Sequence, residues 1–495
     1  MKATKSLFLA GMLLCNSVSG QFKVILDPAK EYQVIENFAA SDAWSGQFVG
    51  TWPAAKKNAI ADLLFSTGNF PDGSPKGIGL SMWRYNIGAG SREQGRESGI
   101  RDEWRRAGNL LSKDGKYNWQ DVAGQVWLLQ AAKERGVKQF LGFLNSPPVH
   151  LTNNGKAFAS QGQCNIDQEK YDALGEYVAG VVKGIRSRTG ITLDYVSPVN
   201  EPQWDWSDGG QEGNPYNNGQ VAGVVRSLSA SLLANRLSTR ILIPEAGHVK
   251  YLLADEDKPG KGNQVNAFFN PASPFYTGNL SNVSKTVAAH SYFSTSPLAS
   301  GIEIRQAIAR RMAEIKGLKY WQSEYCILGD NNGEINGEKR DTGINAALYV
   351  ARTIHTDLTV ANAAAWQWWL AISPYNYKDG LIYIDKGKED GNFYDSKMLW
   401  ALGNYSRFVR PGMKRIEAGF DMPANCMVSA FKQEKDKRIV VVLINAEPVA
   451  KKAILPKRVL EMYVTSSASK LQKQKVRAGA VDIAPASVTT IITGY

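Results

Sequence analysis

Ser197-Pro198-Val199-Asn200-Glu201-Pro202 joins an apolar run to a tight turn and carries a carboxylate at the junction. The apolar segment 193–199 predicts a short buried strand, and the proline after Glu201 predicts the turn. A second stretch, Lys319-Tyr320-Trp321-Gln322-Ser323-Glu324, has the same order of features. In a barrel of parallel strands, functional side chains lie at the carboxyl ends of the strands. The two stretches therefore predict that Glu201 and Glu324 lie at one such edge.

Strand-like and helix-like segments alternate from residue 36 to residue 410. Eight apolar segments begin near Phe38 and end at residues 363–370, and segments with helical periodicity lie between most of them, at 53–66, 122–135, 171–185, 221–237, 302–315 and 342–358. Alternation of this kind favours an α/β fold with a parallel sheet, and eight units fit a (β/α)8 TIM barrel. An open doubly wound sheet is the alternative, but no glycine-rich phosphate loop follows the first strand.

The pattern changes after Arg410-Pro411-Gly412. Short β-type runs at 427–431, 439–444 and 488–492 predict an antiparallel β-sandwich over residues 411–495. The β-type segment 21–35 lies outside the barrel count, so we expect it to join this sandwich. The sequence thus predicts a catalytic barrel at 36–410 and an attached β-sandwich built from both chain ends.

Residues 1–20 have the pattern of a secretory signal peptide. Lys2 and Lys5 precede a short apolar run, 7–14, and small residues follow at 18–20. The run is too short to cross a bilayer, and no later segment is apolar enough to do so. We expect a secreted or periplasmic protein. Cys15 leaves a lipid-anchored protein as the less favoured alternative, because Leu14 is bulky where a small residue usually precedes a lipidated cysteine.

The formal net charge is +12, and the positive charges are spread along the chain. This charge is compatible with an acidic glycan and equally with a role in solubility. The chain lacks a basic aromatic motif, which argues against nucleic-acid binding. Cys164, Cys326 and Cys426 are too far apart in sequence to predict a disulfide framework. The four histidines show no close ligand spacing, so we expect no metal. We also expect no cofactor and a monomeric protein.

The two glutamates predict hydrolysis of a glycosidic bond. That reaction needs a proton on the leaving oxygen and a carboxylate near the anomeric carbon, and two carboxyl groups about 5 to 5.5 Å apart supply both with retention of configuration. Asn200 beside Glu201 can bind a neighbouring sugar hydroxyl, so we assign Glu201 as acid/base and Glu324 as nucleophile. Nearby donors would keep Glu324 charged. The alternative is that both glutamates are surface loop residues.

Further polar and aromatic residues fall at or just past the predicted strand ends. We assign the following to substrate binding: Asp42, Trp44, Arg84, Ser146, Asn200, Trp204, His290, Tyr292, Trp366 and Trp368. Successive side chains of a strand point to opposite faces, so Trp366 and Trp368 share one face and Trp369 points away. We expect the first face to line the site. Glu245 is a third strand-end carboxylate, which we expect to bind hydroxyls rather than to react.

The chain resembles glycoside hydrolase family 30, a family of retaining (β/α)8 glycosidases. The resemblance rests on motifs in the family's order: 33–38 (Gln-Val-Ile-Glu-Asn-Phe), 84–88 (Arg-Tyr-Asn-Ile-Gly), 146–148 (Ser-Pro-Pro), 200–202 (Asn-Glu-Pro), 290–292 (His-Ser-Tyr), 323–324 (Ser-Glu) and 405–412 (Tyr-Ser-Arg-Phe-Val-Arg-Pro-Gly). It implies Glu201 as acid/base and Glu324 as nucleophile, and a β-sandwich built from both chain ends.

Within the family, segments 86–90 and 145–148 and the tryptophan-rich last strand look most like the endo-β-1,6-galactanase branch. This likeness implies action on the galactan side chains of (arabino)galactan. Two segments depart from the family pattern, 37–40 and 149–151, and both lie near the expected sugar site. Other family activities therefore stay open: β-1,6-glucanase, xylanase or exo-β-glycosidase. A non-catalytic carbohydrate-binding protein on the same fold is a further alternative, and a metal-dependent esterase or lyase lacks ligands.

Overall fold

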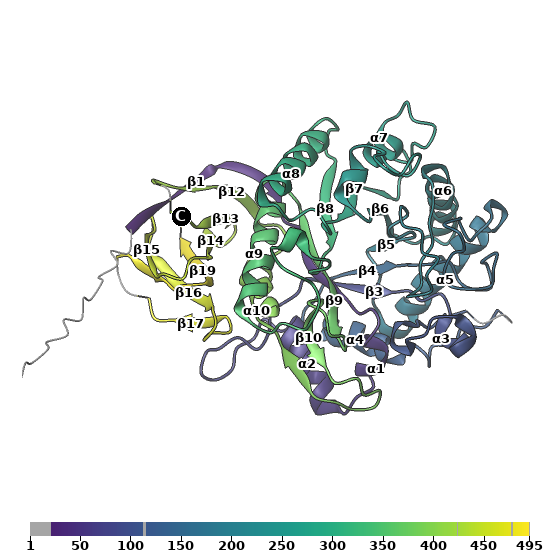
Figure 1. Ribbon diagram of the computed structural model, residues 1–495, viewed down its shortest axis with the longest axis horizontal. Coiled ribbons are helices and arrows are strands. Elements are labelled where there is room, and N and C mark those ends of the chain that lie inside the picture. Colours follow the sequence, from purple (N-terminus) through teal and green to yellow (C-terminus); the bar gives the residue numbers. More distant parts are fainter. Residues whose placement is uncertain (1–20, 112–114, 423, 477–478, 495) are drawn as a thin grey trace, which may run out of the picture.

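The computed structural model describes residues 21–111, 115–422, 424–476 and 479–494. The predicted signal peptide and Cys15 lie outside the described residues. Two bodies are visible in Figure 1: a barrel surrounded by helices, and a second sheet that flanks it at the left of the view, beyond α9 and α10.

The barrel consists of eight parallel strands in chain order. They are β2 (Asn37–Ser41), β3 (Met82–Asn86), β4 (Gln139–Phe143), β5 (Tyr195–Ser197), β6 (Arg240–Ala246), β7 (Val283–His290), β8 (Lys319–Glu324) and β9 (Ala365–Ser373). Each strand pairs in parallel with the next, and β9 pairs with both β2 and β8, which closes the sheet. The predicted (β/α)8 barrel is confirmed. The closed sheet excludes the alternative prediction of an open doubly wound sheet. Nearly every strand residue is buried, because helices cover the outside and side chains fill the inside.

Helices connect the strands and shield the barrel. The α-helices are α1 (Gly46–Val49), α2 (Ala54–Phe65), α3 (Ser91–Gln94), α4 (Ala123–Glu134), α5 (Tyr171–Thr189), α6 (Asn218–Ala234), α7 (Gln264–Phe269), α8 (Leu298–Ala313), α9 (Ile344–Thr359) and α10 (Lys397–Ser406). Short 3-10 helices span Gly95–Ser98, Glu103–Arg105, Gln168–Lys170, Val249–Leu252 and Asn331–Gly333. In α5, Leu174, Val178, Val181 and Ile185 recur at helical spacing and are buried. Gly190, with a φ of 64°, caps the helix directly after Thr189.

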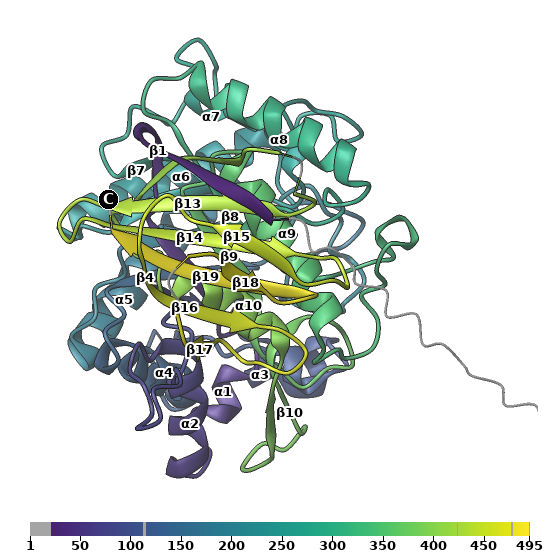
Figure 2. The ribbon, with the colours of Figure 1, turned by 90° about the vertical axis from the view of Figure 1, so that its left-hand side faces the viewer.

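The second sheet has nine strands and is mostly antiparallel. Its strands are β1 (Gln21–Val34), β12 (Lys414–Phe420), β13 (Met427–Gln433), β14 (Arg438–Asn445), β15 (Lys451–Ile454), β16 (Val459–Thr465), β17 (Gln472–Gln474), β18 (Val481–Ile483) and β19 (Ser487–Gly494). Figure 2 views this sheet face-on, and β1 lies between β12 and β15 in the strand order. β1 pairs antiparallel with β12 and parallel with β15, so both chain ends contribute strands to it.

Alternation along β14 shows how the second sheet is buried on both faces. Val441 and Leu443 share an apolar cluster with Ala453 of β15 and Ile483 of β18, so the sheet folds over on itself as a sandwich. Val440, Val442 and Ile444 face the other way and join the cluster of the barrel, where α9 and α10 pack against the sheet. The predicted β-sandwich is thereby confirmed, whereas the proposed domain boundaries at 35 and 410 stay predictions.

Two strands extend the barrel sheet at its mouth. β10 (Gly380–Ile384) pairs with the end of β9, and β11 (Phe393–Asp395) pairs with β10. In the described part of the chain, Cys164, Cys326 and Cys426 are free thiols. None of the helices described here combines the length and the apolar character that crossing a bilayer requires.

Candidate active site

Glu201 reaches the barrel mouth through a strained turn after β5. Its backbone has a φ of 44°, in the left-handed region that side-chain-bearing residues seldom adopt. Three contacts hold the turn: the Glu201 amide donates to the Glu245 carbonyl at 2.8 Å, and the Glu201 carbonyl accepts from the indole of Trp206 at 3.1 Å and from the Trp204 amide at 3.2 Å. The side chain stays at the surface of the cavity, with 7% of the residue exposed. Backbone strain of this kind often accompanies a functional position.

Glu324 ends β8 and is held by two donors. Nη1 of Arg84 lies 3.1 Å from its Oε2, and the Tyr292 hydroxyl donates to its Oε1 at 3.1 Å. Burial raises the pKa of the Glu324 carboxyl, while the positive charges of His290 and Arg84 oppose this rise and the nearby carboxylates add to it. The ionised form of Glu324 therefore depends on its cationic neighbours.

His290, at the end of β7, lies between three carboxylates. Its Nδ1 is 2.7 Å from Oε1 of Glu201 and 3.5 Å from Oε1 of Glu324, and its Nε2 is 3.2 Å from Oε2 of Glu245. Burial alone would lower the pKa of His290, but the charges of Glu324, Glu201 and Glu245 outweigh it and raise that pKa to about 10. The three carboxylates therefore favour the cationic form of the ring.

The two strand-end glutamates lie close together. One oxygen of Glu201, one oxygen of Glu324 and a nitrogen of His290 are all within 4.8 Å of one another. The two carboxylates thus approach closely enough for a retaining pair, whose carboxyl groups lie about 5 to 5.5 Å apart. The same spacing would suit a metal ion, but a protonated His290 offers no lone pair, so a metal would have to displace its proton.

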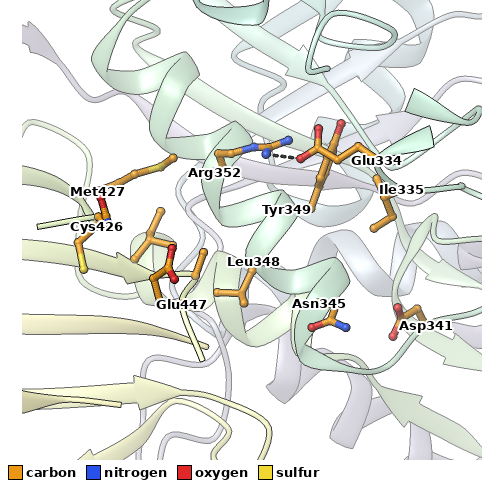
Figure 3. Close-up of a pocket in the computed structure, with 13 residues that line it drawn as sticks. Glu334, Ile335, Asp341, Asn345, Leu348, Tyr349, Arg352, Cys426, Met427 and Glu447 are labelled. Carbon is orange, nitrogen blue, oxygen red and sulfur yellow. Dashed lines mark hydrogen bonds and ion pairs between the residues drawn. The ribbon is translucent and has the colours of Figure 1, made fainter. Parts of the chain in front are cut away.

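A cavity of about 720 Å³ opens beside this pair. It is lined by Asn200, Glu201, Trp204, Asp205, Trp206, Ser207, Asp208, Gln211, Tyr292, Phe293, Glu324, Leu328 and Trp369. A second cleft of about 820 Å³ lies between α9 and the second sheet, where Glu334 and Arg352 pair near Tyr349 (Figure 3). None of the strand-end residues predicted to act lines that second cleft, so the first cavity is the candidate active site.

Some of the predicted binding residues line this cavity, whereas Asp42, Trp44, Arg84 and Ser146 are not among its lining residues. Asn200, Trp204 and Tyr292 line it, and Arg84 contacts Glu324. Asp42 accepts a hydrogen bond from the Asn86 amide at 2.8 Å, and burial raises its pKa to about 7 against the effect of that bond. Trp44 packs edge-on against Trp369 with ring centroids 5.4 Å apart. Ser146 is buried, and its hydroxyl donates to the Pro147 carbonyl at 3.1 Å.

The prediction for the last strand was wrong. Trp366 and Trp368 are both 0% exposed, and their indole nitrogens donate within the protein, to Asp357 at 2.9 Å and to the Asp379 carbonyl at 2.7 Å. Trp369 lines the cavity instead. In the pairing of β2 with β9, Ala40 lies opposite Trp368 and Ser41 lies opposite Leu370, so Trp369 has no partner residue in β2. Such a bulge turns a side chain to a new direction, and strict alternation cannot foresee it.

Sequence reasoning also missed residues that come from loops. Phe293, 54% exposed, and Leu328 line the cavity from the segments after β7 and β8. Asp205 and Asp208 line it from the long segment after Glu201. The sequence could have indicated Phe293 only through its position, because it follows Tyr292 just past the end of a predicted strand. The direction of its side chain depends on loop geometry that the sequence pattern does not encode.

Comparison with known proteins agrees with this geometry. The family model for O-glycosyl hydrolase family 30 matches residues 21–383. The chain is 24% identical over 422 residues to an endo-β-1,6-galactanase of Hypocrea rufa, covering 82% of this chain and 78% of that protein. A conserved exported protein from Bacteroides fragilis has a similar structure, with a TM-score of 0.88, 34% identity and coverage of 95% and 100%. The catalytic domain of a xylanase C from Talaromyces cellulolyticus shares the fold, with a TM-score of 0.70, 22% identity and coverage of 96% and 100%. The chain therefore belongs to O-glycosyl hydrolase family 30.

Proposed function

We propose that this glycosidase hydrolyses β-1,6-linked galactan by double displacement. Glu324 is the nucleophile and Glu201 is the acid/base. The observation that carries this proposal is the close approach of the two carboxylates, which each have an oxygen within 4.8 Å of the other. The asymmetry of their surroundings supports the roles, because two donors, Arg84 and Tyr292, fix the carboxylate of Glu324 in place.

The reaction proceeds in two steps. In the first, an oxygen of Glu324 attacks the anomeric carbon, the glycosidic bond breaks, and the leaving oxygen takes a proton from Glu201. In the second, Glu201 takes a proton from water, the resulting oxygen attacks the anomeric carbon, and the bond to Glu324 breaks. Two inversions give retention, and both glutamates return to their starting protonation states.

The galactan assignment rests on the substrate branch that the motifs resemble and on the galactanase relative, which is 24% identical. The open cavity, lined by Trp204, Trp206 and Trp369, offers indole rings to sugar faces. We further propose that residues 1–20 direct export, that the mature chain is a monomer, and that the barrel and the β-sandwich meet near residues 35 and 410. Asp42, Trp44, Arg84, Asn200, Trp204 and Tyr292 would bind the sugar.

A product profile tests the proposal. Wild type and Glu324→Ala are incubated with β-1,6-galactan, β-1,6-glucan and xylan, and the products are separated by chromatography. Short β-1,6-galacto-oligosaccharides from wild type alone are expected. Products only from glucan or xylan would retain the mechanism and overturn the substrate. Binding of galactan without products from any of the three glycans would favour a non-catalytic carbohydrate-binding protein.

A further inference from the structure

Glu245, which takes no part in the two displacement steps, is a fully buried carboxylate at the end of β6. Its Oε1 accepts a hydrogen bond from the Ser197 hydroxyl at 2.6 Å, and its Oε2 accepts from Ser323 and lies 3.2 Å from Nε2 of His290. Burial alone would raise its pKa, but His290, Arg84 and Ser197 lower it to about 2. These contacts therefore favour the ionised form of Glu245.

The contacts of Glu245 determine which nitrogen of His290 carries a fixed proton. An ionised carboxylate can only accept hydrogen bonds, so Nε2 must donate to Glu245. Nδ1 then faces Glu201 at 2.7 Å. In the cationic ring Nδ1 donates to Glu201, and in the neutral ring Nδ1 accepts from a protonated Glu201. In both states exactly one proton lies between Nδ1 and Oε1 of Glu201.

We propose that Glu245 is a positioning residue: through His290 it holds one proton shared with Glu201 and a positive charge beside Glu324. This inference rests on the proposed roles of Glu201 and Glu324. The backbone supports it, because the Glu245 carbonyl also accepts the Glu201 amide at 2.8 Å. One residue thus fixes both the main chain of Glu201 and the ring that faces its side chain.

The charges around His290 give the sign of the pH effect. The ring is faced by Glu201 from the turn after β5, Glu245 from β6, Glu324 from β8, and Tyr292 from its own loop, with ring centroids 5.8 Å apart. Arg84 from β3 lies beyond Glu324. Neutralising Glu245 removes an anion that stabilises the cationic ring, so the pKa of His290 falls. It also removes repulsion of Glu324, so the pKa of Glu324 falls.

The pH profile of Glu245→Gln is the first test. In the plot of kcat/KM against pH, both the acidic and the alkaline limb are expected to move to lower pH by about one unit. We also expect kcat to fall about tenfold and KM to stay nearly unchanged. Glu212→Gln is the matched control, because Glu212 is also fully buried and accepts from Ser91 at 2.6 Å but does not touch His290. Its limbs should stay at the wild-type pH. Lower activity of Glu245→Gln with unmoved limbs would mean that Glu245 only packs, and would overturn the inference.

A measurement without substrate separates this inference from the proposed function. Histidine is labelled with ¹⁵N, and the ring shifts of His290, assigned with His290→Asn, are followed from pH 5 to pH 11. Wild-type His290 is expected to keep Nε2 protonated throughout the range and to hold its shared proton well above pH 7. A His290 that is neutral at pH 7 with Nε2 unprotonated would overturn the inference, even if Glu245→Gln failed to fold. Because no substrate is present, this measurement tests the inference independently of the galactan assignment.

Discussion

The two sides of the barrel mouth differ in how far their polar side chains are hydrogen-bonded within the protein. On the side of β6 to β8, the side chains of Glu245, His290, Tyr292, Ser323 and Glu324 bond to one another or to Arg84 and Ser197. On the side of β3 to β5, several buried polar atoms have no hydrogen-bond partner within the described residues: Nε and Nη2 of Arg84, both amide atoms of Asn86 and Asn145, and Oδ1 of Asn200. We call these the paired side and the open side.

The difference suggests a division of labour. The paired side holds its charges in fixed positions, which favours electrostatic stabilisation of a transition state without reorganisation. The open side carries a desolvation cost of about 1 to 3 kcal/mol for each buried group left without a partner. Sugar hydroxyls that met these groups would recover that cost. We infer that the paired side supports the chemistry and that the open side recognises the sugar.

The largest effect is expected from neutralising Glu324, the proposed nucleophile, on the paired side. Glu324→Gln should lower kcat by about 10⁴-fold or more, because the covalent step is lost while the cavity keeps its shape. Steady-state kinetics on galactan measure the loss, and circular dichroism checks the fold. Glu314→Gln is the control, since Glu314 forms a surface ion pair with Arg311. If Glu324→Gln kept more than a tenth of the wild-type activity, Glu324 would not be the nucleophile.

An intermediate effect is expected on the open side. Asn200→Ala should lower kcat/KM by about 10²-fold, since a sugar hydroxyl loses its partner, and should leave the melting temperature unchanged or higher. Ser323→Ala on the paired side should instead destabilise the fold by about 1.5 to 3 kcal/mol, because the buried charge of Glu245 loses a donor. Thermal melting and kinetics of both variants make the comparison. Equal stability losses in the two variants would contradict the division into two sides.

The smallest effect on activity distinguishes the tryptophans of β9. Trp369→Ala should lower kcat/KM about tenfold, the loss of roughly 1.4 kcal/mol of contact with a sugar ring. Trp366→Phe should leave activity near wild type but lower the free energy of unfolding by about 1 to 3 kcal/mol, because the buried carboxylate of Asp357 loses the indole donor. Kinetics and urea unfolding measure both. The reverse pattern would restore Trp366 as a substrate contact.

Much of this arrangement was predictable from the sequence, and the limits have physical causes. Strand-end position placed Glu201 and Glu324 at one edge, because parallel strands in a barrel share their carboxyl ends. The bulge at Trp369 arises from the pairing of β2 with β9. Because these strands are far apart in sequence, no local sequence pattern predicts the bulge. The bridging position of His290 depends on carboxylates from three different strand ends, so no single motif encodes it. The direction of Phe293 depends on loop geometry.

The stereochemistry of the first product tests the central claim most directly. Galactan is mixed with the enzyme in an NMR tube, and the anomeric proton of the released reducing end is recorded before mutarotation. A close carboxyl pair that works by double displacement predicts that the β-anomer appears first and that the α-anomer follows as equilibrium is reached. Release of the α-anomer first would mean single displacement by water, and would contradict the assignment of Glu324 as a nucleophile.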